Sequence, residues 1–599
     1  MIFLIFVVLN CIGLGCIQKQ LPNASFGLQL AFSTLIFLLW MCFGGVFLGY
    51  FCILHRWSAT IWIGLFILFS TVHIHHISIP KHGIDKIQII ILSCCTFIYG
   101  ILATPPVWYR DTLAYHLTLP KIWSSSGGYQ QTDQILFEYF PSLWQWGLSF
   151  LFVFGKEDNP VFHPRYIGIV ITLMTSLIIG EIIKDLFQKN NPQNRYLSKY
   201  YKNIGILCYL LIPTVIEFGT SVYVMPWLSF LCITSVYLYI HQSIQPSRFG
   251  FLFEIIIGAA IISSKYSGLI WIFCLICLKT TTQRRNKILQ YGCFVGCTGS
   301  FFYIRNFLIH NNPVFPKLSS IFGSGFFGEW RSWAYDITLQ DYGSGRDFFD
   351  YCLLPFRMFS SFDLQYGFQG SLGLSIGILF TLCLYHNRNI RYLLIPWFLL
   401  WAVQVQQIRF FIPAVGVIVI YGLIKIPQNR LWILASLSII WSIYPIQHLW
   451  KRQQGFDYWT KYVDERDFLR TQLPENYPID EYINSMESHK KVWYVWMRGY
   501  TYYSPKEIRV DSVFGAWRFE KLLEQSERPT DVVLSLHRDN ISHVVINHRF
   551  FLVDGNADLQ EGRTEKLQLQ FQLLIEDDLL IPVHQIKSVV IYKVTETNL

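Results

Sequence analysis

The chain has 599 residues, of which 52% are hydrophobic, 17% aromatic and only 15% charged, and its mean hydropathy is +0.35. Soluble globular proteins are about one quarter charged. Apolar runs of about 18 residues or more recur along this chain, each long enough to cross a bilayer core of roughly 30 Å. These features predict a helical membrane protein. The net charge of +9 is therefore no nucleic-acid signal, and we expect most of it on cytoplasmic loops.

Taken in chain order, the apolar runs predict about 13 to 14 membrane spans and a mainly α fold. They lie near 1–17, 27–54, 58–74, 88–106, 162–183, 203–219, 224–241, 249–264, 266–279, 288–306, 369–385, 391–405, 409–424 and 430–447. The first run lacks a basic region and a cleavage site, so we expect an uncleaved span rather than a signal peptide. The run 142–155 is too short to cross and is expected to be an interfacial or re-entrant helix.

The distribution of basic residues predicts how these spans are oriented. With the N-terminus outside, seven short cytoplasmic connections carry 17 Lys and Arg residues, whereas the short connections on the other side carry few. The positive-inside rule favours this arrangement. If 142–155 crossed the membrane, every later loop would change sides and the basic set near 181–203 would face outward.

The orientation divides the chain into three predicted parts. Residues 1–87 are extra N-terminal transmembrane helices, and 88–448 are a transmembrane catalytic domain with extracytoplasmic loops 107–161 and 307–368. Residues 449–599 are a soluble extracytoplasmic domain, which we expect to be small and α/β. Its strand candidates are "KVWYVWM", "SHVVIN" and "SVVIYKV", and its helix candidate is "RFEKLLEQ".

Ionisable residues at helix ends on the outer side are the functional candidates, because charge near the membrane is costly unless it is used. One carboxylate, Asp111, meets several cations on this face. A base beside cations suits a reaction in which a nucleophile is activated while an anionic leaving group is held. The candidates on this face are Arg110, Asp111, His116, Glu138, Arg165, Lys265, Arg305, Asn306 and Arg409.

Five motifs in a fixed order carry a resemblance to a known family. They are "RDTLAYHLTLPKIW", "FPSLWQWGLSFLF", "GAAIISSKYSGL", "RNFLIHNNPVFP" and "IRFFIPAV". In this order and on one membrane face they resemble the GT-C membrane glycosyltransferases. The resemblance is closest to the bacterial branch related to protein O-mannosyltransferases and lipid A aminoarabinose transferases. It spans roughly 88–425.

The resemblance implies a polyprenyl-phosphate sugar donor and inversion at the anomeric carbon. It implies that Asp111 is the catalytic base and that Lys265, Arg305 and Arg409 hold the lipid phosphate. His116 is a second catalytic candidate, since no second acid stands beside Asp111. Two features depart from the family. Members often have paired acids at the first motif, whereas in this chain Asp111 is flanked by Arg110 and Thr112. In this chain, three helices also precede the span at 88–106.

Simpler interpretations stand beside these. Asp111 could cap a helix that begins at Thr112, and Lys265 and Arg305 could snorkel to lipid headgroups. A cation at a helix start, as at Arg409, needs a compensating anion. Histidines 73, 75, 76 and 82 are expected to be juxtamembrane rather than a metal site, and no spacing, including that of Cys274 and Cys277, predicts a metal. No cofactor is expected, although a divalent metal stays open.

The sequence thus favours an inverting glycosyltransferase in the bacterial inner membrane, with Asp111 as general base. Its expected partners are a polyprenyl-phosphate-sugar donor, an acceptor that is a lipid, a glycan or a protein, and membrane lipids, but no nucleic acid. Two alternatives remain. An O-antigen polymerase or ligase would use arginines in the loop 307–368, and a secondary transporter would show internal repeats.

Overall fold

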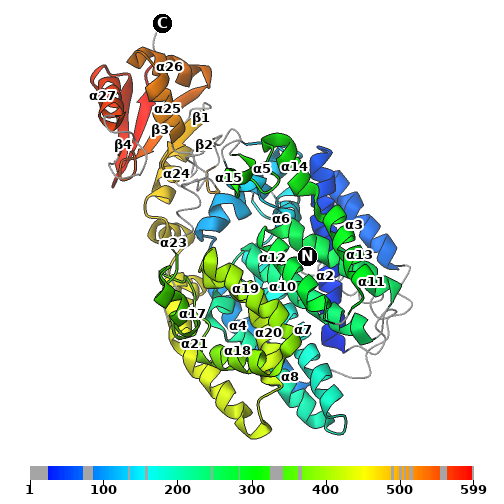
Figure 1. The fold of residues 1–599 in the computed structure, drawn as a ribbon. Helices are drawn as coiled ribbons and strands as arrows, with labels where there is room; N and C mark the ends of the chain where they lie inside the picture. The colour runs from blue at the N-terminus through cyan, green and yellow to red at the C-terminus, as the bar shows by residue number, and fades with distance from the viewer. Residues whose placement is uncertain are drawn as a thin grey trace.

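The structure is a computed structural model of a helical bundle with a small sheet domain beyond one end of it (Figure 1). It describes residues 25–71, 85–132, 135–155, 159–244, 247–281, 283–323, 342–361, 367–486, 491–497, 502–504, 508–510, 517–552 and 563–596. The predicted span 1–17 and the four histidines between 73 and 82 lie outside the described residues.

The helices of the bundle cover the predicted spans of the described part, but the spans 203–219 and 288–306 are each two helices, the second divided at Ser300. In chain order they are α2 (Phe26–Tyr50), α3 (Arg56–Thr71), α4 (Lys86–Ala103), α7 (Arg165–Asn190), α8 (Arg195–Leu210), α9 (Pro213–Gly219), α10 (Val224–Ile244), α11 (Arg248–Ser264), α12 (Ser267–Lys279), α13 (Arg285–Gly299), α14 (Phe301–His310), α18 (Leu374–His386), α19 (Arg388–Val403), α20 (Ile412–Leu423) and α21 (Leu431–Gln453). By length and composition five described helices can cross a membrane, or six if the bent pair α8–α9 is one span. Several other predicted spans are shorter, since α12, α18 and α20 have 13, 13 and 12 residues.

Short elements lie in the connections between these helices. They are the π-helical turn η2 (Thr112–His116), α5 (Thr118–Ser125), η3 (Leu136–Tyr139), α6 (Leu143–Val153), α15 (Ser319–Phe322), α17 (Phe348–Ser360), η5 (Ile408–Phe411) and η6 (Gln428–Arg430). The 11 residues of α6 rise only about 16 Å, so this helix does not cross a bilayer. It is almost wholly buried against α2 and α5, which differs from the interfacial position that we considered for it.

Two glycines explain how closely α2 approaches α6. A Cβ on Gly45 would lie 2.2 Å from the Trp146 carbonyl oxygen, and one on Gly49 would lie 2.0 Å from the Trp146 ring. Any larger residue would push the helices apart. Because α2 also packs on α7, this N-terminal helix belongs to the same core as the segment that follows residue 88.

The predicted span at 203–219 is two helices rather than one. α8 begins earlier, at Arg195, and the chain bends by 69° before α9. Pro213 causes the break, since proline has no N–H to continue α8 but is well suited to the first turn of a new helix. The bend leads the chain to Thr220, which contacts Arg165, and to Tyr223, which contacts Arg409.

The C-terminal domain has the predicted α/β character. Its strands are β1 (Lys491–Val495), β2 (Ile508–Val510), β3 (Ile541–Asn547), β4 (Leu580–Ile586) and β5 (Val589–Val594), in the order β2-β1-β3-β5-β4. β1 is parallel to β2 and β3, whereas β5 is antiparallel to β3 and β4. The helices are α22 (Gly455–Trp459), α23 (Glu465–Gln472), α24 (Asn476–Ser485), α25 (Trp517–Gln525), α26 (Pro529–Arg538) and α27 (Arg563–Glu576).

The alternation of side chains along β1 builds two small cores in this domain. Trp493 and Val495 face a cluster with residues of α25, α26 and α27, while Val492 and Tyr494 face residues of α24. The domain also contacts the first outer loop: the Lys121 ammonium donates to the Tyr502 carbonyl at 3.0 Å. Loop and domain therefore lie at the same end of the bundle.

Candidate functional site

Asp111 lies at the start of a π-helical turn. The Leu117 N–H donates to the Thr112 carbonyl at 3.0 Å, an i→i+5 bond, and π turns often mark functional sites. The Asp111 side chain makes no capping hydrogen bond, so the interpretation of this residue as a helix cap is wrong. A π turn has more residues than an α turn, so it brings Asp111 and His116, five residues apart, closer to the same side than an α-helix would.

Arg409 forms an ion pair with Asp111. Its Nη1 donates to Asp111 Oδ2 at 2.8 Å, and its Nε donates to Gln407 Oε1 at 2.8 Å. The guanidinium carbon lies 5.0 Å from the centre of the Phe410 ring and 5.3 Å from that of Tyr223. We expected Arg409, a cation at a helix start, to need a compensating anion. Asp111 is that anion.

Lys265 occupies the turn between α11 and α12, at the same end of the bundle. Its Nζ lies 3.9 Å above the centre of the Phe410 ring, and its one described hydrogen-bond partner is the Met225 sulfur at 3.4 Å. Among the described residues no carboxylate pairs with this ammonium. Burial, followed by the charge of Arg409, holds the pKa of Lys265 well below its usual range. Because Arg409 already neutralises Asp111, an anionic ligand beside Lys265 would favour the charged ammonium and balance its charge.

His116 is buried beside this cluster and paired with a residue that sequence reasoning missed. Gln145 Nε2, on α6, lies 2.9 Å from His116 Nδ1. The amide nitrogen donates, so Nδ1 accepts and the imidazole proton is on Nε2. Burial, followed by the charges of Lys265 and Arg409, holds the pKa of His116 well below its usual range. The imidazole is therefore neutral near pH 7.

Arg305, Asn306 and Glu138 form a separate cluster. The Arg305 guanidinium donates to Tyr50 Oη at 3.0 Å and to Asn306 Oδ1 at 2.9 Å, and makes no described hydrogen bond or ion pair with Asp111. Glu138 is fully buried and accepts from the Thr132 N–H at 2.9 Å. Burial raises the pKa of this carboxyl. These three residues were predicted at the same membrane face as Asp111, but they do not belong to the cluster around it.

The remaining predicted residues differ sharply in burial. Arg110 is exposed. Arg165 is fully buried at the first position of α7, where its guanidinium donates to backbone and side-chain oxygens. In the described ranges, no group of three or more His, Cys, Asp and Glu residues lies close enough together to hold a metal.

Tyr223 is a second residue that the sequence did not point to. Its ring centre lies 5.4 Å from that of His116, and its hydroxyl contacts the Asp111 backbone. Gln145 lies within an apolar run, and Tyr223 and Gln407 lie in short connections between predicted spans, where no charge of their own marks them. The bend before α9 was the one available signal, since it turns the chain toward the site.

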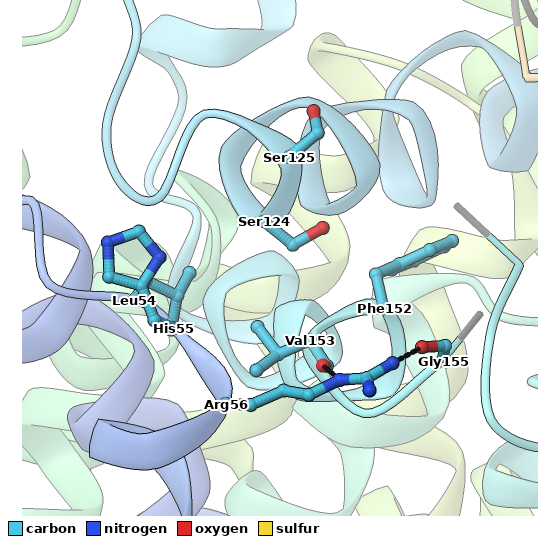
Figure 2. A pocket seen from close by; sticks show the side chains of 8 residues that line it. All are labelled: Leu54, His55, Arg56, Ser124, Ser125, Phe152, Val153 and Gly155. Carbon is cyan, nitrogen blue, oxygen red and sulfur yellow. Dashed lines mark hydrogen bonds between the residues drawn. The ribbon is translucent and has the colours of Figure 1, made fainter. Parts of the chain in front are cut away.

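A surface pocket lies elsewhere, between the start of α3 and the ends of α5 and α6 (Figure 2). It has a volume of about 320 Å³. Arg56 donates to the Val153 carbonyl at 3.1 Å and to the Gly155 carbonyl, and the Ser124 and Ser125 hydroxyls donate to carbonyls of their own helix. Most donors that line the pocket are thus already used, so it is a poor anion site.

Comparisons with known proteins connect this arrangement to a fold. No family model matches the chain, and no curated protein matches its sequence. The chain is similar to the crystal structure of ArnT from Cupriavidus metallidurans bound to undecaprenyl phosphate, with a TM-score of 0.52 and 10% identity, over 85% of this chain and 98% of that one. ArnT in the apo state matches with a TM-score of 0.49 and 10% identity, over 84% and 97%.

The first match shows that the chain has the polytopic membrane fold of ArnT, the GT-C fold that the sequence motifs suggested. The predicted fold class, many membrane helices followed by a small C-terminal α/β domain, is confirmed. The protein is therefore a multi-pass membrane protein.

Proposed function

We propose that this protein is an inverting glycosyltransferase that moves a sugar from a polyprenyl-phosphate donor to an acceptor hydroxyl. The ArnT structure of the same fold holds undecaprenyl phosphate, which supports a lipid-phosphate donor here. The one-sided distribution of basic residues supports a reaction at the extracytoplasmic face of the inner membrane.

The cluster of Asp111, Arg409 and Lys265 is the observation that carries the proposal. A polyprenyl phosphate brings a negative charge to a site that has one carboxylate and two cations. Lys265 has no anionic partner among the described residues, and Arg409 spends only part of its guanidinium on Asp111 and Gln407. Both cations would bind the phosphate before and after transfer, and they would also stabilise the negative charge that grows on the leaving oxygen.

Asp111 is the proposed base. Arg409 occupies Oδ2, whereas Oδ1 accepts no described hydrogen bond, and 29% of the side chain is exposed. Oδ1 would take the proton of the acceptor hydroxyl while the acceptor oxygen bonds to the anomeric carbon and the bond from that carbon to the phosphate oxygen breaks. A single displacement from the face opposite the phosphate inverts the anomeric configuration.

His116 is a proposed second contact for the substrate. Its imidazole is neutral, and neither its Nε2 nor Gln145 Oε1 has a described partner. A neutral donor and acceptor suit sugar hydroxyls, which carry no charge. Arg305 is left out of the proposed phosphate site because its guanidinium is already bonded to Tyr50 and Asn306.

The described arginines of the loop 307–368 do not favour an O-antigen polymerase or ligase. Arg346 donates to the Ala402 carbonyl at 2.6 Å, and Arg357 pairs with Asp350 at 2.6 Å. Arg346 thus attaches the loop to the end of α19, and Arg357 pairs within α17, so both arginines are used in structural contacts.

Binding of undecaprenyl phosphate to the purified protein in detergent tests the proposal. We expect Lys265→Met to weaken this binding by about tenfold or more, since a charge-assisted contact contributes about 1.5–3 kcal/mol. Arg110→Gln, which removes an exposed cation next to Asp111, is the matched control and should bind normally. Equal affinities in the wild type and both variants would refute the phosphate site.

A further inference from the structure

Arg165 is a buried cation without an acidic partner among the described residues. It is the first residue of α7, where the positive end of the helix disfavours a cation, and its side chain is fully buried. Its Nε donates to the Thr220 carbonyl at 2.7 Å, Nη1 to the Pro105 carbonyl at 3.0 Å, and Nη2 to the Leu102 carbonyl at 2.7 Å and to Gln453 Oε1.

These four oxygens come from the ends of three helices. Leu102 lies in the last turn of α4 and Pro105 two residues beyond its end, Thr220 directly follows α9, and Gln453, which offers its side-chain oxygen, is the last residue of α21. The last carbonyls of a helix have no partner within it and carry the negative end of its dipole. In place of a carboxylate, the guanidinium thus has two helix-end carbonyls, of Leu102 and Thr220, together with the Pro105 carbonyl and the Gln453 side-chain oxygen, and it holds these segments together.

The segments that meet at Arg165 lead directly to the proposed site. Gln453 Nε2 donates to Tyr109 Oη at 2.7 Å, and Tyr109 is two residues before Asp111. On the other side Thr220 is three residues before Tyr223, whose ring lies under the Arg409 guanidinium. Arg165 therefore restrains the backbone on both sides of the Asp111–Arg409 pair without contacting either residue.

We propose that Arg165 is a positioning residue that sets the place of Asp111 and Tyr223 through the Gln453–Tyr109 hydrogen bond and the Thr220 carbonyl. The inference rests on the proposed role of Asp111. Displacing a catalytic group by about 1 Å can cost a hundredfold in rate. Loss of the Arg165 contacts should therefore lower kcat and leave the affinity for the lipid phosphate near normal.

Two variants test this inference. Arg165→Lys keeps the charge but cannot reach four oxygens in three directions, and we expect kcat to fall by about a hundredfold. Tyr109→Phe removes a single hydroxyl and leaves the guanidinium in place, so it should fold even if the lysine variant does not. We expect it to lower kcat by about tenfold.

The matched control is Lys279→Met. Lys279 is another fully buried cation, but it pairs with Glu254 near the opposite end of α12 from Lys265. This variant should be less stable yet keep the wild-type kcat per folded molecule. In all variants the dissociation constant of undecaprenyl phosphate is measured beside kcat, and we expect it to change by about twofold at most in Arg165→Lys and Tyr109→Phe.

Hydrogen exchange of the peptides that cover 104–116 and 219–224 gives a readout independent of turnover. We expect faster exchange there in Arg165→Lys and unchanged exchange in Lys279→Met. Wild-type kcat in both Arg165→Lys and Tyr109→Phe, with Asp111→Asn inactive, would overturn the inference and leave the proposed function standing. An active Asp111→Asn would overturn the proposed function, and the exchange rates would then decide whether Arg165 holds these segments.

Discussion

Replacing Asp111 by asparagine separates a catalytic carboxylate from a structural one. The amide keeps the size of the side chain, and its oxygen can still accept a hydrogen bond from Arg409. What it loses is the negative charge and the ability to take a proton. Loss of a general base costs about a hundredfold to ten-thousandfold in rate, which corresponds to about 2.7–5.4 kcal/mol in the activation free energy.

The structural cost of the same change is much smaller. The Asp111–Arg409 pair is partly open to solvent, since 29% and 14% of the two side chains are exposed. Pairs this accessible contribute at most about 1 kcal/mol to stability. A protein with a folding free energy of about 5–15 kcal/mol remains folded after such a loss. A hundredfold fall in turnover therefore cannot come from unfolding.

The assay is sugar transfer from a polyprenyl-phosphate donor, run beside thermal unfolding of the same preparation. Asp350→Asn is the matched control, because Asp350 also pairs with an arginine, at 2.6 Å, and has a similar side-chain exposure of 22%. We expect this control to retain turnover. Near-normal turnover in Asp111→Asn would refute the reasoning and reduce Asp111 to the counter-ion of Arg409.

Three further outcomes follow from the same contacts. Lys265→Met should raise the donor KM by about tenfold or more, with a smaller change in kcat, because it removes a charge that contacts the phosphate before and after transfer. Steady-state kinetics with varied donor concentration measures both constants. A changed kcat at constant KM would contradict this role of Lys265. Lys279→Met should lower the unfolding free energy by about 3–5 kcal/mol, because Glu254 is then buried without a partner, and the double change with Glu254→Leu should recover most of the loss; thermal unfolding measures both, and equal stability of the single and double variants would contradict the explanation. His116 has a pKa well below 6.5 in the folded state, so as the pH falls below 6.5 the unfolded chain takes up a proton first and the protein loses about 1.4 kcal/mol of stability per pH unit. His116→Gln should remove this contribution to the pH dependence of denaturant unfolding between pH 7.5 and 5. Parallel curves of stability against pH for the wild type and the variant would show that the imidazole is not buried as described.

The sequence was informative where charge interrupts an apolar run. Asp111, Lys265 and Arg409 stand at the ends of predicted spans, and the parity of those spans sufficed to place them at one end of the bundle. The same argument also selected Arg305 and Glu138, which lie in another cluster. The parity of the spans predicts the side of the membrane on which a residue lies, but it does not predict how far apart two residues on that side are. Contacts decide the lateral arrangement, and they involve residues more than 200 positions apart, as in the 298-residue separation of Arg409 and Asp111.

Neutral partners and backbone irregularities escaped prediction for a different reason. Gln145 and Tyr223 are surrounded in sequence by apolar residues, so neither composition nor periodicity distinguishes them from core residues. The π turn at 112–116 differs from an α turn by one hydrogen-bond register, which local propensity does not resolve. The break before Pro213 was readable in principle, but a continuous apolar run concealed it.

The hydrogen bonds of Arg165 also set an order of events during synthesis of the chain. Its carbonyl partners on α4 are made before it, but Gln453 is made 288 residues later. At an elongation rate of about 5–20 residues per second, this residue emerges roughly 15–60 s after Arg165. Until then the guanidinium lacks one of its four acceptors, and Tyr109 lacks the donor that fixes it. A nascent chain that has already inserted the helices next to Asp111 and Lys265 therefore still lacks the Gln453 contacts, and the segment around Tyr109 is fixed only when α21 arrives.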